Sequence, residues 1–490
     1  MKKIIFEKMN GLYFSLLMLV IILTGVAVYG LFKPLPEGVS YEGSLHDIDD
    51  ARFYYDVTYE TEDGEWVYEQ QIFDEVIEVI DRAENYLLLD LFLFNDFHDR
   101  EEDMPELSRR VTDAVLKKKD ENPEMNVIFI TDEFNTGYGS HRSPHLDELE
   151  EAGVHTIISD LTPLRDSKPI YSSIYRTFFQ WFGRGDRGWL PHPLSEGAPS
   201  ITARSYLKML NLKANHRKVV VSDKEAFITS ANPHDGSAYY SNIGFRVTGS
   251  VIEDVWEAEK AVASFSSEDD LPFPGSEDFL YEERAAEING ADEGLKAKHL
   301  TESSIKDHLM EQIENAGSGD RITIGAYYLA EDSTMDAIVD ASFRDVEIRV
   351  VLDPNSYSFN QETQGLPNRP AARELKERSE GRVQIRWYHI DEDQYHSKIM
   401  VFENDQEITM IGGSSNFTRR NMDDFNLDAS IMIQAPLSSD LAAEVNSYFE
   451  RLWTNEDGIF TLHLDEYEDD LGFWKPTTYR LQQWFYLTTY

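Results

Sequence analysis

Cysteine is absent from the 490-residue sequence, which excludes disulfides, thiolate metal ligands and a cysteine nucleophile and leaves the redox compartment undetermined. Basic residues are scarce, because 45 Lys and Arg stand against 90 Asp and Glu and give a formal net charge of −45. So acidic a surface repels polyanions at long range, which argues against nucleic acid as the substrate. The hydrophobic content of 41% is nevertheless ample for a folded core.

Charge is also missing from residues 11–32. A helix needs about 20 apolar residues to cross a bilayer, so this stretch predicts a transmembrane anchor. Three lysines within residues 1–10 predict a cytoplasmic N-terminus. The protein is then expected in the cell membrane, single-pass, with its catalytic body on the extracytoplasmic side. A cleaved signal peptide is the alternative, although its apolar region would be shorter and the cleavage sites here are poor.

Residues 33–70 contain two prolines and many carboxylates, which predicts a spacer with little core of its own. Beyond it, helix and strand patterns alternate, and they predict a layered α/β domain over residues 71–263. The predicted elements are a helix at 73–80, a strand at 86–94, a helix at 106–119, a strand at 126–131, a helix at 146–152 and a strand at 154–158.

The same order returns in residues 295–455, which indicates an internal duplication with a period of about 180 residues. The predicted elements here are a helix at 305–313, a strand at 321–329, a helix at 333–342, a strand at 346–352, a helix at 371–378 and a strand at 383–389. An acidic segment at 264–294, with proline and glycine, is the expected linker between the halves. Residues 456–490 form an aromatic tail that either touches the bilayer or packs across the halves.

Each half ends in a copy of one motif. A Lys follows a His by two residues, an acidic residue follows the Lys by five, and a small-residue turn ends in Asn, with a second Asn ten residues later. Alternate residues of a strand share a face, so the His and Lys side chains point to the same side. The first copy comprises His216, Lys218, Asp223, Ser230, Asn232 and Asn242, and the second His396, Lys398, Glu403, Ser414, Asn416, Asn426 and Asp428.

Imidazole, ammonium and amide groups together suit an anionic, tetrahedral group such as phosphate. Two such half-sites in one chain predict a single composite active site, so a monomer is expected to be functional. The chemistry calls for no metal and no cofactor.

These motifs resemble those of the phospholipase D superfamily, where H-x-K-x4-D precedes G-S-x-N and a later N-x-E. The first copy fits the opening element fully, whereas Glu403 replaces the aspartate in the second. The resemblance covers roughly residues 70–455. It implies two pseudo-twofold-related phospholipase D-like α/β sandwich domains, with the His216 and His396 strands meeting at their interface.

In that superfamily one His attacks phosphorus to form a phosphohistidine and the other protonates the leaving alcohol. The resemblance makes His216 the nucleophile and His396 the acid, with the two lysines catalytic. Chemistry alone favours the reverse, because Asp428 in the second half could hold the His396 imidazole. The residues expected to bind phosphate are Ser230, Asn232, Ser414 and Asn416. The residues expected to hold the catalytic and phosphate-binding side chains in place are Asp223, Asn242, Glu403, Asn426 and Asp428.

One insertion, residues 161–213, has no counterpart in the second half. Basic residues outnumber acidic ones in it, and several aromatic residues lie among them: Tyr175, Phe178, Phe179, Trp181 and Phe182. This mixture fits a segment at a lipid headgroup layer, or a lid over the site. A helix that packs its aromatic residues in the core is an equally good explanation.

The sequence therefore predicts a membrane-anchored phosphodiesterase, hydrolase or transferase, that acts on phospholipid headgroups. Cardiolipin synthase is the nearest named activity, although the usual cardiolipin synthases have two membrane spans. A nuclease of the same superfamily is the second hypothesis. A catalytically decayed binding module is the third, suggested by departures from the pattern at Thr229, Gly244 and Glu403. The sequence leaves open the headgroup and the choice between hydrolysis and transfer.

Overall fold

The fold is that of a computed structural model, and it is built on two large β-sheets. The structure describes residues 2–100, 103–182, 185, 187–193, 195, 197–280, 294–358, 361–362 and 365–471.

The first half contains a seven-stranded sheet in the order β2-β10-β9-β8-β5-β6-β7. Strands β5, β6 and β7 are parallel, and the other pairings are antiparallel. The strands are β2 (Ala51–Tyr55), β5 (Tyr86–Leu91), β6 (Asn126–Thr131), β7 (His155–Ile158), β8 (Lys218–Ser222), β9 (Glu225–Thr229) and β10 (Ile243–Thr248).

The second half contains a nine-stranded sheet in the order β1-β11-β19-β18-β17-β12-β13-β16-β20. Its strands are β11 (Lys296–Thr301), β12 (Arg321–Ala326), β13 (Glu347–Leu352), β16 (Gln384–Tyr388), β17 (Lys398–Glu403), β18 (Glu407–Gly413) and β19 (Ala429–Pro436), with β1 (His46–Asp47) and β20 (Thr461–His463) at the edges.

The two sheets repeat one topology. Without its edge strands, the second sheet has the same strand order as the first, and β12, β13 and β16 are parallel like β5, β6 and β7. The predicted α/β fold with two pseudo-twofold-related halves is thereby confirmed.

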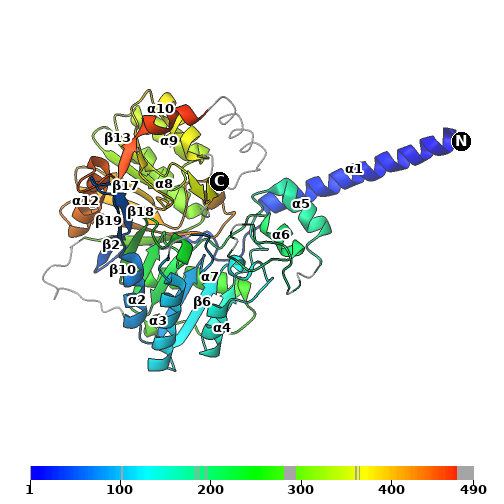
Figure 1. Ribbon diagram of the computed structural model, residues 1–490, viewed down its shortest axis with the longest axis horizontal. Helices are drawn as coiled ribbons and strands as arrows, with labels where there is room; N and C mark the ends of the chain where they lie inside the picture. Colours follow the sequence, from blue (N-terminus) through cyan, green and yellow to red (C-terminus); the bar gives the residue numbers. More distant parts are fainter. Residues whose placement is uncertain are drawn as a thin grey trace.

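Helices cover the outer face of each sheet, because side chains alternate along the strands. In β5, Leu87 and Leu89 pack among the helices, whereas Leu88 belongs to the core between the sheets. The first sheet is covered by α2 (Ile72–Arg82), α3 (Leu107–Glu121) and α4 (Pro144–Glu151), and the second by α8 (Ser303–Asn315), α9 (Asp332–Ser342) and α10 (Asn368–Arg378) (Figure 1).

The inner faces of the sheets share one hydrophobic core. Ile243 and Phe245 of β10 lie against Gly412 of β18, so the halves meet closely at the centre. Two helices cross between them: α7 (Val251–Ser266) of the first half contacts β11, and α12 (Asp440–Thr454) of the second contacts β2. The halves are therefore interlocked, and they do not form two separate bodies.

Residues 33–70 differ from the expected spacer. They contain β1, an edge strand of the second sheet, and β2, an edge strand of the first. They also contain a hairpin of β3 (Val57–Glu60) and β4 (Trp66–Glu69). Phe53 and Val57 are buried in the core between the sheets. A second small hairpin pairs β14 (Tyr357–Ser358) with β15 (Gln361–Glu362).

A single helix, α1 (Lys2–Phe32), projects from the body (Figure 1). Within the described residues it is the one helix long and apolar enough to span a membrane, over Gly11–Phe32. Its C-terminal end contacts α5 (Pro169–Phe178) of the insertion, which also contains α6 (Ala203–Met209).

The insertion does not pack its aromatic residues in the core, which was one of the two sequence interpretations. Phe178, Phe179, Trp181 and Phe182 are all exposed. The aromatic residues that characterise the predicted tail fall within 472–490, and part of the predicted linker falls within 281–293, so both lie outside the described residues.

Candidate active site

The two motif strands begin at the interface between the halves. The backbone before β8 pairs with the chain that precedes β19: His216 N–H donates to the Leu427 carbonyl at 2.8 Å, and Leu427 N–H to that of Ala214 at 3.0 Å. The backbone before β17 repeats this with the first half, since His396 N–H donates to the Ser241 carbonyl at 2.7 Å. Each His is therefore placed by the opposite half of the chain.

The two imidazoles are held by different groups. Nδ1 of His216 lies 2.8 Å from Oδ1 of Asp428, and Nδ1 of His396 lies 3.0 Å from Oδ1 of Asn242. The interpretation that Asp428 holds His396, its neighbour in sequence, is wrong, because the motif strands pair across the interface. A carboxylate thus orients His216 and a neutral amide orients His396.

The structure also corrects the alignment of the two motifs. The Ser230 hydroxyl donates to Oδ1 of Asn242 at 3.0 Å, just as the Ser414 hydroxyl lies 3.2 Å from Oδ1 of Asp428. The following residues, Ile243 and Ala429, donate their N–H groups to the same hydroxyls at 3.0 and 2.9 Å. Asn242 is therefore the counterpart of Asp428. Counting ten residues from the turn asparagine pairs Asn242 with Asn426 instead, which places Gly244 opposite Asp428, two residues out of register.

Ser230 and Ser414 are fully buried, and these contacts engage both hydroxyls within the protein. We propose that they hold Asn242 and Asp428 in place, in a positioning role that differs from the phosphate contact expected of them.

Both lysines are buried beside the imidazoles. Each Nζ donates to the backbone carbonyl of the His in its own motif, over 2.7 Å for Lys218. Each also lies over an aromatic ring: Nζ of Lys218 is 5.0 Å from the centroid of the Phe92 ring, and Nζ of Lys398 is 5.2 Å from that of the Tyr327 ring. Burial lowers the pKa of Lys218 to about 7 and that of Lys398 well below its usual value. An incoming anion would favour the charged form of both.

The four groups act on one another electrostatically. Burial, followed by the charges of Lys218 and Lys398, lowers the pKa of His216 well below its usual value. Burial and the same two lysines lower the pKa of His396. Both imidazoles are therefore neutral near pH 7, and the two half-sites lie within mutual electrostatic range.

The turn asparagines leave polar atoms without partners. Asn232 and Asn416 are buried, and neither amide oxygen has a hydrogen-bond partner within the described residues. A buried polar atom without a partner is costly, which marks these symmetric positions as places for a polar ligand. Rotation of either amide by half a turn would present N–H donors to that ligand.

Two supporting carboxylates were not found from the sequence. Asp132 accepts the N–H of Asn215, and Asp353 that of Tyr395, each at 2.7 Å. They follow directly after the parallel strands β6 and β13, so an acidic residue at the carboxyl end of a buried strand was the available signal. Burial raises the pKa of both to about 7.

Arg420 was missed as well. It lies in α11 (Arg419–Met422), four residues after Asn416, and its charge contributes to lowering the pKa of His216. Burial lowers the pKa of Arg420 itself to about 10. Arginine recognises phosphate well, so it adds a cation to the site.

Three of the predicted supporting residues make contacts with groups other than the motif His and Lys side chains. Asp223 accepts hydrogen bonds from the N–H groups of Glu84 and Asn85, which fixes the turn before β5. Glu403 pairs with Asn446 at 2.9 Å at the end of β17. The Asn426 amide oxygen accepts the N–H of Ala214 at 3.1 Å and so holds the backbone that leads to His216.

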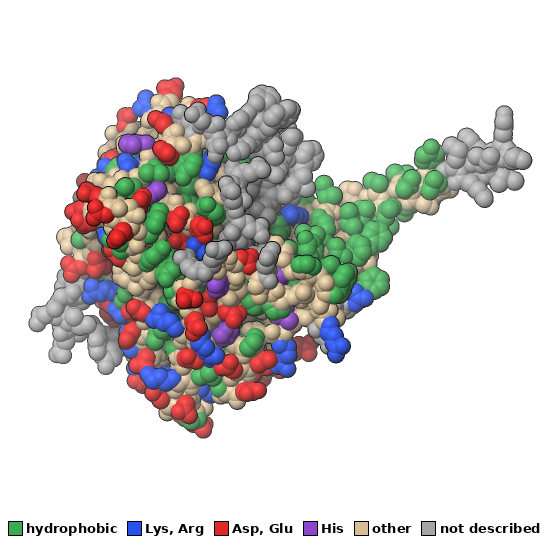
Figure 2. Space-filling model, viewed as in Figure 1, with side chains coloured by type: hydrophobic (Ala, Val, Ile, Leu, Met, Phe, Trp, Pro, Cys, Tyr) green, Lys and Arg blue, Asp and Glu red, His purple; other side chains and the backbone are tan. Residues whose placement is uncertain are grey.

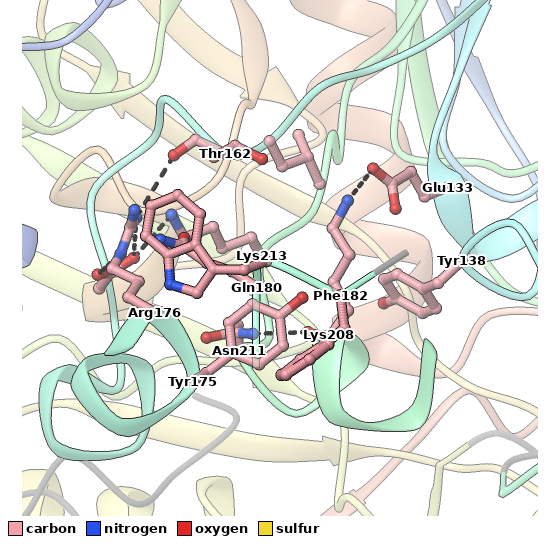
Figure 3. A pocket seen from close by; sticks show the side chains of 13 residues that line it. Glu133, Tyr138, Thr162, Tyr175, Arg176, Gln180, Phe182, Lys208, Asn211 and Lys213 are labelled. Atoms are coloured by element: carbon pink, nitrogen blue, oxygen red, sulfur yellow. Dashed lines mark hydrogen bonds and ion pairs between the residues drawn. The ribbon is translucent and has the colours of Figure 1, made fainter. Parts of the chain in front are cut away.

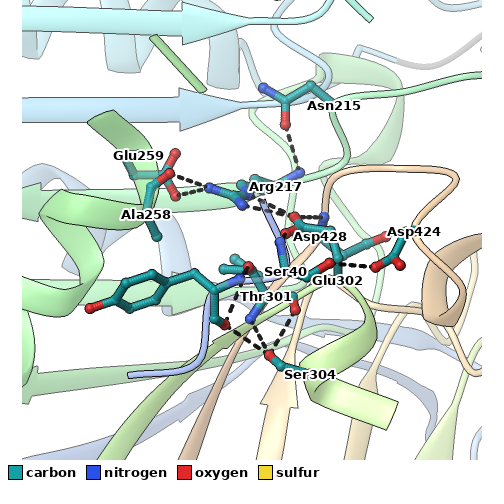
Figure 4. A network of polar contacts seen from close by, with 12 residues as sticks. Ser40, Asn215, Arg217, Ala258, Glu259, Thr301, Glu302, Ser304, Asp424 and Asp428 are labelled. Carbon is teal, nitrogen blue, oxygen red and sulfur yellow. Dashed lines mark hydrogen bonds and ion pairs between the residues drawn. The ribbon is translucent and has the colours of Figure 1, made fainter. Parts of the chain in front are cut away.

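A buried charge network supports the Asp428 backbone (Figure 4). Arg217 is fully buried, and its guanidinium donates to Glu302 at 2.8 Å and to Glu259 at 3.2 Å. Glu302 also accepts the N–H of Asp428 at 3.0 Å and, through its other oxygen, that of Ser40 at 2.8 Å. The network thus connects the segment after α1 to the group that orients His216.

Replacing Arg217 with methionine is expected to lower the free energy of unfolding by about 3–5 kcal/mol, because two buried carboxylates lose their cation. Urea unfolding of the full chain in detergent, followed by circular dichroism, measures the change. Lys224→Met is the matched control, since Lys224 pairs with the exposed Glu84 and should cost less than about 1 kcal/mol. Equal stability of the two variants would contradict the role of the network.

A separate cavity of about 470 Å³ lies in the insertion, between α5, α6 and the segment after β7 (Figure 3). Its lining includes Tyr175, Trp181 and Phe182, together with Lys208, whose ammonium pairs with Glu133. No residue of the two His-Lys motifs lines it. In the part of the chain that the structure describes, no group of three His, Asp or Glu side chains is placed to hold a metal ion.

Comparisons with known proteins agree with this architecture. Residues 309–453, which include the second motif, match the family model described as "Cardiolipin synthase, PLD-like domain". The structure is similar to that of phosphatidylserine synthase from Haemophilus influenzae Rd KW20, with a TM-score of 0.50 and 12% sequence identity over 94% of this chain and 96% of that one. Residues 309–453 therefore form a PLD-like domain, and the whole chain shares the fold of that similar structure.

Two other solved structures show weaker similarity to this chain. Polyphosphate kinase from Porphyromonas gingivalis is 11% identical, with a TM-score of 0.42 over 84% of this chain and 48% of that chain. Nuc from Salmonella typhimurium, a phospholipase D family member, is 17% identical, with a TM-score of 0.26 over 34% of this chain and 99% of that one. None of the curated proteins matches the chain.

Proposed function

We propose that the whole chain is a phospholipase D superfamily protein, and that it is a membrane-anchored phosphodiesterase or phosphatidyltransferase that acts on phospholipid headgroups. The names of the matching family model and of one similar structure, cardiolipin synthase and phosphatidylserine synthase, both concern phospholipids, which supports this class of substrate. The apolar helix α1 supports a location at the membrane.

The observation that carries the proposal is the unequal support of the two imidazoles. Asp428 holds Nδ1 of His216, which fixes the tautomer and raises the basicity of Nε2. Asn242 is a neutral amide, so its contact with His396 does not raise the basicity of that imidazole in the same way. His216 is therefore the nucleophile and His396 the general acid, the same division that the superfamily resemblance implied.

The reaction has two steps. Nε2 of His216 attacks phosphorus, the bond from phosphorus to the leaving alcohol oxygen breaks, and His396 gives that oxygen a proton. The bound phosphodiester anion favours the protonated His396 needed for this step. In the second step His396 takes the proton of water or an acceptor alcohol, whose oxygen attacks phosphorus and displaces His216.

Negative charge grows on the phosphoryl oxygens in both steps. Lys218 and Lys398, one from each half, supply cations, and the amides of Asn232 and Asn416 supply donors when rotated toward the ligand. Because the two lysines are buried and each is held by the carbonyl of its own motif histidine, they need little reorganisation as the charge develops.

The test uses the full chain reconstituted into vesicles of phosphatidylcholine, phosphatidylethanolamine and phosphatidylglycerol. Release of free headgroup reports hydrolysis, and transfer of the phosphatidyl group to added glycerol reports exchange. Single-stranded DNA and bis(p-nitrophenyl) phosphate are assayed in parallel. Turnover of DNA alone would establish the nuclease, and inactivity on every substrate at several salt concentrations would support the decayed binding module.

A further inference from the structure

The end of α1 is fixed to the insertion. The Gly30 carbonyl accepts the N–H of Asp166 at 2.9 Å, and Nζ of Lys33 donates to the Thr162 carbonyl at 2.6 Å. The helix α5 lies directly against α1. Within α1, Leu23, Val26 and Ala27 are less exposed than their neighbours, at a spacing of three to four residues that marks one helix face. The helix α5 thus lies beside the last turns of the apolar span.

The opposite side of α5 is apolar and uncovered. Pro169, Ser172 and Ser173 form its buried face. Ile170, Ile174 and Phe178, four residues apart, are 60%, 38% and 45% exposed. Trp181, just after the helix, is 75% exposed. Figure 2 shows hydrophobic side chains continuing from α1 onto this part of the body.

We propose that the exposed face of α5 and the aromatic residues that follow it lie in the interface of the leaflet that α1 enters, as a second contact with the phospholipid bilayer. The inference rests on the proposed membrane anchoring. If α1 spans the bilayer, a helix packed against its last turns lies at the depth of the lipid headgroups. Aromatic residues with arginine nearby are typical of that layer. A bilayer is therefore the occupant that the position of α1 selects.

The second contact orients the active site. Burial, followed by the charge of Arg420, lowers the pKa of Lys168 at the start of α5 to about 8, so this end of the helix lies near the site. Arg165, just before it, donates to Asp424 of the second half at 2.7 Å. The platform, defined as α5 together with Phe179–Phe182, therefore connects the bilayer to Arg420 and Asp424, which lie beside the His216 site.

The absence of cysteine makes the test direct, because one introduced cysteine is labelled alone. Phe178→Cys carries a polarity-sensitive fluorophore in the full chain, reconstituted into phosphatidylcholine and phosphatidylglycerol vesicles that contain nitroxide lipids. Phe343→Cys is the matched control, because Phe343 is 47% exposed at the end of α9 in the other half. The probe at 178 is expected to be quenched by shallow nitroxides several-fold more than the probe at 343.

Equal quenching at the two positions would overturn the proposal. Protection of the probe at 178 from nitroxide quenching would also overturn the proposal if that protection disappears when the protein is diluted within the vesicles. A second copy of the chain would then cover this face. The labelling result does not depend on catalysis, so it stands even if the proposed function fails.

A functional measurement follows from the same geometry. Ile174→Glu combined with Phe178→Glu is expected to lower turnover of vesicle phospholipid at least about tenfold, because carboxylates resist entry into the bilayer. Turnover of bis(p-nitrophenyl) phosphate, which is water-soluble, should stay unchanged. Equal loss on both substrates would indicate damage to the fold or a lid over the site, and would overturn the platform. Phe343→Glu is the control and should change neither.

Discussion

His216→Ala is expected to lower turnover by about 10,000-fold or more on every phosphodiester, because it removes the atom that attacks phosphorus. A good leaving group cannot rescue this variant, since the missing step precedes departure of the alcohol. Rapid acid-free quenching with substrate labelled at phosphorus should find the labelled phosphoryl group, still esterified to its second alcohol, on the wild-type protein and none on His216→Ala. A labelled His216→Ala protein would contradict the assignment.

The comparison with His396→Ala makes this test specific. Loss of a general acid should cost about 100- to 10,000-fold on a phospholipid, whose alcohol leaves poorly. On bis(p-nitrophenyl) phosphate the first step should be nearly unaffected, because p-nitrophenolate leaves without a proton, and a burst of product should appear. If His216→Ala shows the burst and His396→Ala does not, the two roles are reversed.

Asp428→Asn is expected to lower turnover by about 1,000-fold, because both imidazoles would then be held by amides and His216 would lose its basic partner. Burial raises the pKa of Asp428 to about 7, so its carboxylate forms as the pH rises through neutrality. Wild-type activity should therefore fall as the pH drops below 7, and this limb should disappear from the variant. The pH profile separates the positioning role from simple loss of structure.

Asn242→Ala is the matched variant for that experiment. It occupies the corresponding place opposite His396, but it removes only a neutral acceptor, and we expect a loss of about tenfold. A larger loss for Asn242→Ala than for Asp428→Asn would show that support of His396 limits the reaction. Thermal unfolding of both variants checks that their folds are intact.

Much of the fold followed from local patterns. The apolar runs that became β5, β6, β12 and β13 were recognisable because parallel strands are buried on both faces. Two of them ended earlier than predicted: β5 stops at Leu91 and β12 at Ala326, and the next residues, Phe92 and Tyr327, turn their rings toward the lysines. An apolar residue that serves the site cannot be distinguished from one that extends the strand by hydropathy alone.

The spacer was misread for a related reason. Strand β2 is five residues long and β3 and β4 have four each, so their alternating pattern is too short to stand out among carboxylates. The pairing partners of β1 and β2 lie far along the chain, since β1 pairs with β11 and β2 pairs with β10. Long-range pairing of this kind leaves no local signal.

The orientation of the imidazoles could not be derived from one sequence either. Asn232 is followed by β10 after ten residues, whereas Asn416 is followed by β19 after twelve, because α11 occupies part of the longer turn. Counting from the asparagine therefore pairs Asn242 with Asn426, two residues before its true counterpart. The contact of Asp428 with His216 depends further on how the halves pack, which spacing within one half does not encode.

The exchange of orienting residues between the halves has a consequence for the history of such a site. If two identical copies of one half associated, each imidazole would receive the same partner, and symmetry would make the two histidines interchangeable. Once both halves are covalently joined, each position can diverge independently, as Asp428 and Asn242 have done. Fusion of the halves is thus what allows one histidine to become a dedicated nucleophile and the other a dedicated acid.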